Sequence, residues 1–307
     1  MAFQQHQRAV LSRLQKDIPE AVKSSALLRL AQGQTDMAAN EFTGVYLPLA
    51  SLIHRRIGAL QTIRAQSAEA LGAAPVTTPF IIGLAGSVAV GKSTAAKLLQ
   101  YALAAWPEHP DVALVTSDGF LFPNDELEQR GLVERKGFPE SFDGNRLVDF
   151  LLRLKSGEKE VTAPLYSHVT YDVMPGQGLV VQSPDIVIVE GINVLQPHLP
   201  DGGKDHLFAS DFFDYSIYMH ADEILIKQWY TERFLALTEA AANDSQSFYS
   251  RFVPLTAGQR LAVADFVWTT INGKNLNDHI LPTRLRADLI LYKGPDHVIT
   301  HIEIRNR

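Results

Sequence analysis

Eight consecutive residues carry a phosphate-binding pattern. Residues 86–93 read Gly-Ser-Val-Ala-Val-Gly-Lys-Ser, which matches the spacing G-x-x-x-x-G-K-[ST]. The two glycines let the backbone turn so that several N–H groups point inward at phosphate oxygens. Lys92 adds a mobile positive charge, and the hydroxyl of Ser93 can ligate Mg²⁺. An apolar run at residues 80–85 precedes the pattern and a helix-forming stretch at residues 94–101 follows it, so we interpret it as a nucleotide site rather than an empty glycine-rich turn.

The whole loop and the first helical residue after it are expected to hold the nucleotide phosphates. These residues are Gly86, Ser87, Val88, Ala89, Val90, Gly91, Lys92, Ser93 and Thr94.

Two acidic residues follow predicted strands. Asp118 comes after a β-branched run at residues 112–116, and Glu190 ends an apolar run at residues 186–189. Chemistry in α/β folds lies at the C-terminal ends of the strands, and we expect both strands to lie beside the loop strand. One carboxylate can then act as a base for an alcohol and the other as a direct or water-mediated metal partner. The alternative is a helix cap or turn role, since Asp before Gly is common in turns.

Further candidates lie in a predicted helix and in a polar loop. In the helix at residues 223–237, spacings of three and four put Tyr230, Arg233 and Phe234 on one face, where they can wall a pocket and aim a guanidinium at phosphate. Periodicity alone favours a core face with one surface arginine. His168 lies in a stretch crowded with hydrogen-bonding side chains, which by itself favours a surface loop. The histidine spacings match no metal-binding motif.

Composition limits the class of protein. With 307 residues, 46% of them apolar, the chain can bury a large core, and we expect one large α/β domain with additions. The net charge of −6 provides no basic surface for nucleic acid or for anionic lipid. The absence of cysteine excludes disulfides, thiolate metal sites and cysteine nucleophiles. No apolar leader or long apolar run is present, so a cytoplasmic location is expected.

Alternation of strands and helices predicts the fold. We expect a P-loop NTPase-like α/β fold: a mostly parallel sheet with helices on both faces. The predicted strands lie at residues 80–85, 112–116, 186–189, 213–219, 288–292 and 298–304, the last two as a hairpin, and helices lie at 146–155, 223–237 and 257–275. Residues 120–142 are expected to be irregular and rich in aromatic residues, and residues 161–178 to form a mixed loop. Residues 1–78 are predicted to form a helical N-terminal extension packed on a nucleotide-binding domain at residues 79–307.

Six segments carry a family pattern in the same order along the chain. They lie at residues 85–94, 116–121, 136–143, 166–172, 190–195 and 280–284. From about Tyr46 to the C-terminus they resemble the bacterial type I pantothenate kinases of the P-loop kinase superfamily. The phosphate loop is common to that superfamily. The Lys-Gly-Phe-Pro-Glu-Ser and Tyr-Ser-His runs, which begin at Lys136 and Tyr166, are far more specific.

The resemblance implies an activity and a set of residues. The activity is ATP-dependent phosphorylation of pantothenate to 4'-phosphopantothenate, the first step of coenzyme A biosynthesis. Lys92 and Ser93 would bind ATP and Mg²⁺, with Glu190 assisting the metal. Asp118 would accept the hydroxyl proton and Arg233 would stabilise the moving phosphoryl group. The implied acceptor site consists of Tyr166, His168, Tyr171, Tyr230 and Asn272. Family membership also implies a homodimer, with coenzyme A or its thioesters as feedback inhibitor near His168.

Two other functions share part of this pattern. Another small-alcohol kinase, such as a uridine or phosphoribulose kinase, would have the same loop and strand-end acid. A non-catalytic, nucleotide-dependent binding module is a different class. The sequence contains no Asn-Lys-x-Asp guanine-reading motif, and its aromatic insertions favour an enclosed second substrate.

Overall fold

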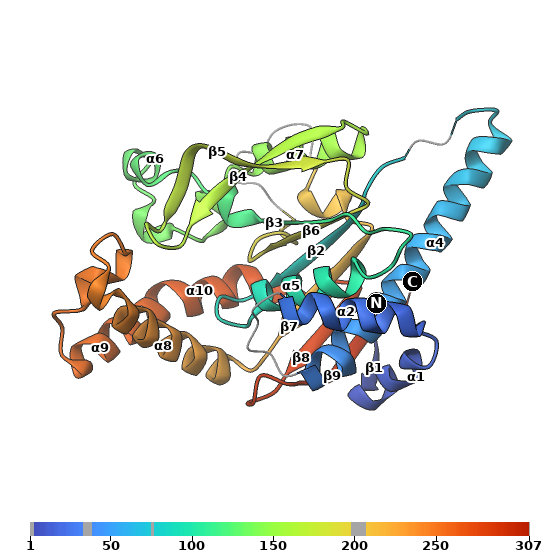
Figure 1. Cartoon of the computed structure of the whole chain (residues 1–307). Coiled ribbons are helices and arrows are strands. Elements are labelled where there is room, and N and C mark those ends of the chain that lie inside the picture. The colour runs from blue at the N-terminus through green and yellow to red at the C-terminus, as the bar shows by residue number, and fades with distance from the viewer. Residues whose placement is uncertain (1–2, 33–38, 75–76, 198–206, 307) are drawn as a thin grey trace.

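A seven-stranded sheet forms the centre of the molecule (Figure 1). The computed structural model describes residues 3–32, 39–74, 77–197 and 207–306. The strand order is β1-β9-β8-β7-β2-β6-β3. The strands are β1 (Phe3–Gln7), β2 (Phe80–Gly86), β3 (Val112–Thr116), β6 (Ile186–Gly191), β7 (Tyr215–His220), β8 (Leu289–Lys293) and β9 (Ile299–Arg305). Strands β8, β7, β2, β6 and β3 run parallel, and β9 and β1 are antiparallel at one edge.

Helices cover the sheet, as predicted. Strands β2 and β6 are buried along their whole lengths, which requires cover on both faces and explains their continuous apolar runs. Helix α5 (Lys92–Leu103) packs on β2, β3 and β6, and helices α2 (Glu20–Gln32) and α4 (Leu47–Ala70) pack on α5. The remaining α-helices are α1 (Leu11–Gln15), α3 (Ala39–Glu41), α6 (Asn124–Gln129), α7 (Gly144–Lys155), α8 (Glu223–Ala240), α9 (Ala257–Val267) and α10 (Gly273–Asn275). No helix among the described residues is long and apolar enough to cross a membrane.

The first residues of the chain differ from the expected helical extension. Residues Phe3–Gln7 form strand β1, which pairs with β9 and places Phe3 opposite Arg305. This strand is rich in glutamine and mostly exposed, so its sequence carries no strand pattern, and the open edge of β9 decides its conformation. The helices that follow agree with the prediction. One hydrophobic core runs without a break from α1 to β9, and a domain division at residue 78 stays a prediction. Residues 75–76, beside that division, lie outside the described residues.

The expected loop at residues 161–178 is instead a β-hairpin. Strands β4 (Glu160–Ser167) and β5 (Asp172–Gln182) form a separate antiparallel sheet with a register shift between Pro164 and Tyr166. Pro164 in β4 and the proline and two glycines of β5 conceal the usual alternation, because such residues occur at edges and irregular positions of sheets. The predicted helix at 257–275 is divided by a π-helical turn at Trp268–Asn272. In Figure 1 the hairpin lies above the sheet, and α8 and α9 project to its left.

Candidate nucleotide and acceptor site

The phosphate loop connects the end of β2 to the start of α5. Gly91 has φ of +93°, a left-handed conformation that favours glycine, and it directly precedes Lys92, the first residue of the helix. Lys92 donates to the carbonyl oxygen of Ser87 at 2.8 Å, so the ammonium group lies within its own loop. The buried hydroxyl of Ser87 has no hydrogen-bond partner among the described residues. A polar buried loop with an unused donor fits an anionic ligand.

The candidate metal ligands contact each other. The hydroxyl of Ser93 donates to Oε1 of Glu190 at 2.8 Å, because β6 lies next to β2 and their C-terminal ends meet at one edge. Burial raises the pKa of Glu190, and the charge of Lys92 and the Ser93 hydrogen bond oppose the rise. Burial lowers the pKa of Lys92, while Glu190 and Asp118 oppose that shift. The two acids and the lysine therefore form one electrostatic cluster.

Asp118 reaches the cluster from a more distant strand than expected. Strand β3 pairs with β6 and not with β2, so it lies two places from the loop strand rather than beside it. A 3-10 turn, Ser117–Phe120, follows β3, and the Thr116 side chain accepts from the backbone N–H of Asp118. The turn carries Asp118 back toward the cluster, where its charge acts on both Lys92 and Glu190.

Aromatic side chains from the β4–β5 hairpin face Asp118. The Tyr166 ring lies 5.2 Å from that of His168 and 6.0 Å from that of Tyr171, both edge-on. Tyr171 stacks on Phe248 at 4.6 Å, so the hairpin meets the segment that follows α8. Burial raises the pKa of Tyr166 and of Tyr171, and the charge of Asp118 adds to both shifts. His168 is exposed, and its interaction with Glu190 lowers the pKa of that carboxyl.

Helix α8 contributes the remaining predicted residues. Burial raises the pKa of Tyr230, and the side chain of Asn272, in the π-helical turn after α9, opposes that rise. Arg233 is exposed, and its positive charge opposes the rise in pKa that burial gives Tyr171. The same charge lowers the pKa of Lys92 further. The charge of Arg233 thus acts on both the phosphate-loop lysine and a hairpin tyrosine.

Comparison with known proteins identifies the relatives of this chain. It is 47% identical over 99% of its length to the pantothenate kinase of Parvibaculum lavamentivorans, covering 93% of that protein. It is 48% identical over 97% of its length to the pantothenate kinase of Halalkalibacterium halodurans, covering 96% of it. The chain belongs to the pantothenate kinase family. The sequence profile of the phosphoribulokinase / uridine kinase family also matches residues 81–233.

Solved structures support the fold of this pantothenate kinase family member. The D-glycerate 3-kinase of Cryptococcus neoformans superimposes with a TM-score of 0.54 at 13% identity, over 84% of this chain and 99% of that one. A putative fructose transport system kinase from Silicibacter sp. TM1040 gives a TM-score of 0.51 at 24% identity, over 73% of this chain and 94% of that one. Both likenesses concern the fold alone.

A lysine that sequence reasoning did not assign to the site contacts two of the hairpin tyrosines in this family member. Lys136 donates to Oδ1 of Asn124 at 2.6 Å and to the carbonyl oxygen of Tyr171 at 2.5 Å. Its ammonium lies 4.7 Å from the centre of the Tyr171 ring and 5.4 Å from that of Tyr166. Burial lowers its pKa to about 8, and the charges of Asp172 and Asp118 oppose the shift. The sequence feature that could have pointed to Lys136 is its position in the Lys-Gly-Phe-Pro-Glu-Ser run.

A second lysine that sequence reasoning did not assign to the site donates a hydrogen bond to the phosphate loop. Lys293, at the end of β8, donates to the carbonyl oxygen of Val90 at 2.8 Å. Its ammonium lies 5.3 Å from the Trp229 ring, and burial lowers its pKa to about 8. The residue lines a cavity of about 620 Å³ at the ends of β7 and β8. Only the parallel pairing of β7 with β8 brings this late residue to the loop.

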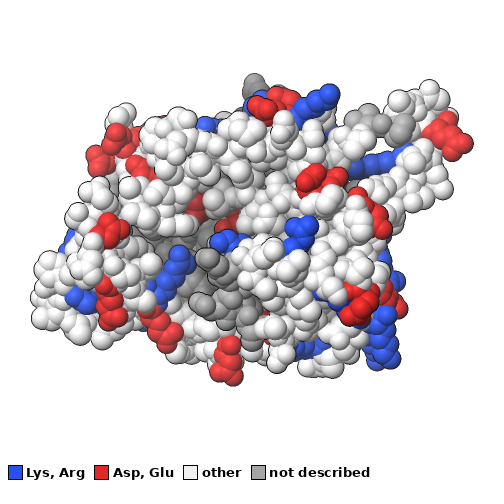
Figure 2. Space-filling view, in the orientation of Figure 1, with Lys and Arg blue, Asp and Glu red and all other residues white. Residues whose placement is uncertain are grey.

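The face in Figure 2 is hollowed near its centre, where basic and acidic side chains lie close together. Among the described residues, no three His, Cys, Asp or Glu side chains are grouped as metal ligands. A hydroxyl and a single carboxylate, Ser93 and Glu190, nevertheless suit Mg²⁺, which keeps several waters and is commonly held through few protein oxygens plus substrate phosphates. The arrangement can hold a nucleotide on one side and a polar acceptor on the other.

Proposed function

We propose that this chain transfers the γ-phosphoryl group of ATP to the primary hydroxyl of pantothenate, the first step of coenzyme A biosynthesis. The observation that carries the proposal is identity of 46–48% with proteins named pantothenate kinase over nearly the full length of both chains. The geometry supports it, because a phosphate loop faces a carboxylate and a wall of tyrosines. Phosphoryl transfer needs little beyond such positioning and charge.

The donor side holds the triphosphate. The loop N–H groups and Lys92 bind the β- and γ-phosphates, and Ser93 and Glu190 would hold Mg²⁺. Bound there, Mg²⁺ supplies positive charge to the phosphate oxygens. Release of Lys92 from the Ser87 carbonyl frees its ammonium for the phosphates. Lys293 keeps the loop in place through Val90.

The acceptor side presents the alcohol. Asp118 accepts the hydroxyl proton while the oxygen forms its bond to the γ-phosphorus and the bond to the ADP oxygen breaks. Arg233 offsets the negative charge on the moving phosphoryl group. The groups proposed to line the acceptor are Tyr166, His168, Tyr171, Tyr230 and Asn272. The tyrosine rings in this set exclude water, which protects the transfer from hydrolysis.

Three further properties are proposed from the family resemblance. The protein forms a homodimer, acts in the cytoplasm, where its ATP is available, and is inhibited by coenzyme A or a thioester of it near His168. Sedimentation analysis measures whether the protein is a homodimer. Titration of the ATPase assay with coenzyme A measures the last, and unchanged turnover at millimolar coenzyme A contradicts it.

A parallel assay tests the activity. ATP consumption is measured with pantothenate, uridine and ribulose 5-phosphate at equal concentrations. The proposal requires turnover with pantothenate and little with the other two. Turnover with uridine or ribulose 5-phosphate alone would instead support the related small-alcohol kinases that share the profile at residues 81–233. Nucleotide binding without turnover of any acceptor would favour a binding module.

A further inference from the structure

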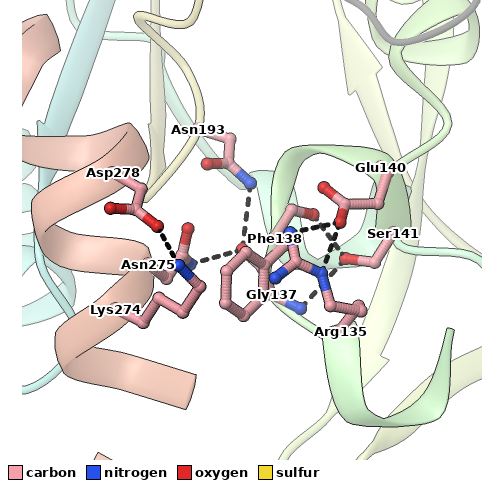
Figure 3. Close-up of polar contacts among 9 residues, drawn as sticks. All are labelled: Arg135, Gly137, Phe138, Glu140, Ser141, Asn193, Lys274, Asn275 and Asp278. Carbon is pink, nitrogen blue, oxygen red and sulfur yellow. Dashed lines mark hydrogen bonds and ion pairs between the residues drawn. The ribbon is translucent and has the colours of Figure 1, made fainter. Parts of the chain in front are cut away.

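The loop that contains Lys136 is held by polar contacts to residues from several elements (Figure 3). Phe138 is fully buried, and the Arg135 guanidinium lies 3.5 Å from the centre of its ring. Arg135 also pairs with Glu140 at 2.6 Å. This run carries much of the family resemblance, yet the donor and acceptor chemistry described above gives it no role.

Both peptide planes next to Gly137 are fixed. Its N–H donates to the hydroxyl oxygen of Ser141 at 2.9 Å, and that hydroxyl donates to the carbonyl oxygen of Phe138 at 2.7 Å. Its carbonyl oxygen accepts from the side-chain amides of Asn193 at 3.2 Å and Asn275 at 2.8 Å. Gly137 has φ of +92°, which side-chain-bearing residues rarely adopt. The backbone that carries Lys136 is therefore held at its next residue.

The two amides come from opposite sides of the site. Asn193 follows Glu190 by three residues, just past the end of β6. Asn275 follows Asn272 by three residues and is only 4% exposed. Figure 3 shows both side chains converging on Gly137 from different elements. One carbonyl oxygen thus joins the strand of the candidate metal ligand to the helix beside the acceptor residues.

We propose that Asn193 and Asn275 are positioning residues that act through the Gly137 carbonyl to hold the Lys136 ammonium against the acceptor-side tyrosines and near Asp118. A lysine has a flexible four-carbon stem, so the place of its charge depends on the backbone that carries it. The far end of this lysine already has fixed partners in Asn124 and the Tyr171 carbonyl. The inference rests on the proposed function, because it assigns these groups to the acceptor site.

A double-mutant cycle tests whether Asn275 acts through Lys136. We expect Asn275→Ala to raise the KM for pantothenate about 2-fold, the equivalent of one weak hydrogen bond, and to leave the KM for ATP unchanged. In a Lys136→Met background the same substitution should raise that KM no further, because the group being positioned is gone. Additive effects, or an equal rise in the KM for ATP, would overturn the proposal.

The chain offers a matched control on the same helical segment. Asn277 is exposed and donates its own side-chain hydrogen bond to Glu223 at 3.2 Å. Asn277→Ala therefore removes a similar bond without touching Gly137, and both KM values should stay at the wild-type level. If Asn275→Ala does not fold, as judged by loss of cooperative thermal unfolding, Asn193→Ala carries the same cycle, since Asn193 is only half-buried.

A pH profile separates positioning from a general structural role. Wild-type KM for pantothenate should rise above about pH 8 as Lys136 loses its proton. In Asn275→Ala the ammonium is less confined, so the rise should move toward higher pH; a profile unchanged from wild type would count against the proposal. If wild-type protein does not turn over pantothenate at all, the proposed function fails first, and the cycle is run with the acceptor that the parallel assay identifies.

Discussion

The two halves of the site are built in different ways. The donor half is one continuous stretch, in which β2, the phosphate loop and α5 follow each other along the chain. The acceptor half collects side chains from the β4–β5 hairpin, the loop around Gly137, helix α8 and the π-helical turn near Asn272. Local geometry therefore determines where phosphate binds, whereas long-range packing determines what receives it. Substitutions in the two halves should separate the kinetic constants of ATP from those of the acceptor.

Removal of the acceptor-side base should have the largest effect. We expect Asp118→Asn to lower kcat by about 10³-fold, within the span usual for a general base, while ATP affinity changes little. Steady-state kinetics and nucleotide titration measure the two quantities. Asp125→Asn, an exposed acid on α6, is the control. A near-normal rate in Asp118→Asn would remove this residue from the mechanism.

Removal of the donor-side charge should affect ATP in both ground and transition states. Lys92→Ala is expected to lower kcat about 100-fold and to raise the KM for ATP, because the ammonium contacts phosphate oxygens throughout the reaction. The KM for pantothenate should stay unchanged. An unaltered ATP response in this variant would contradict the assignment of the phosphate loop.

Loss of one aromatic wall should affect the acceptor alone. Phe248 stacks on Tyr171, so we expect Phe248→Ala to raise the KM for pantothenate about 5-fold with no change in the KM for ATP. Phe266→Ala is the matched control, because Phe266 is 65% exposed on α9. A rise in the KM for ATP alone would mean that the wall belongs to the nucleotide half.

The smallest expected effect concerns the charge of Lys136. Burial lowers its pKa to about 8, so the side chain is charged at pH 7 and mostly neutral at pH 9. The KM for pantothenate should therefore rise roughly threefold between these values, as when one partly exposed charge interaction is lost. Lys136→Arg stays charged and should show no such rise. Persistence of the rise in this variant would assign it to another group.

The donor half followed from sequence because its signals are local. The spacing of Gly86, Gly91 and Lys92 between an apolar run and a helix specifies one conformation. The central parallel strands were predicted nearly to their ends, since strands covered on both faces are continuously apolar. Family resemblance, rather than periodicity, assigned His168 and Arg233 to the site.

The errors arose where distant partners decide the structure. Strand β1 forms because β9 offers a free edge, and the β4–β5 hairpin forms although Pro164 and Gly178 lie within its strands. The strand that precedes Asp118 was predicted to lie beside the loop strand, but it lies two places away. Strand order is a property of the whole sheet, and the sequence of a single strand does not determine it.

Residue types and spacings alone determined that this chain holds a phosphate loop, two strand-end acids and a mostly parallel sheet. Tertiary structure alone decided that Lys136 lies beneath two tyrosines, that Lys293 supports the loop and that two asparagines share the Gly137 carbonyl. The physical reason is the distance along the chain over which each feature is decided. A backbone turn depends on neighbours a few residues away, whereas the place of a charge depends on every element that packs around it.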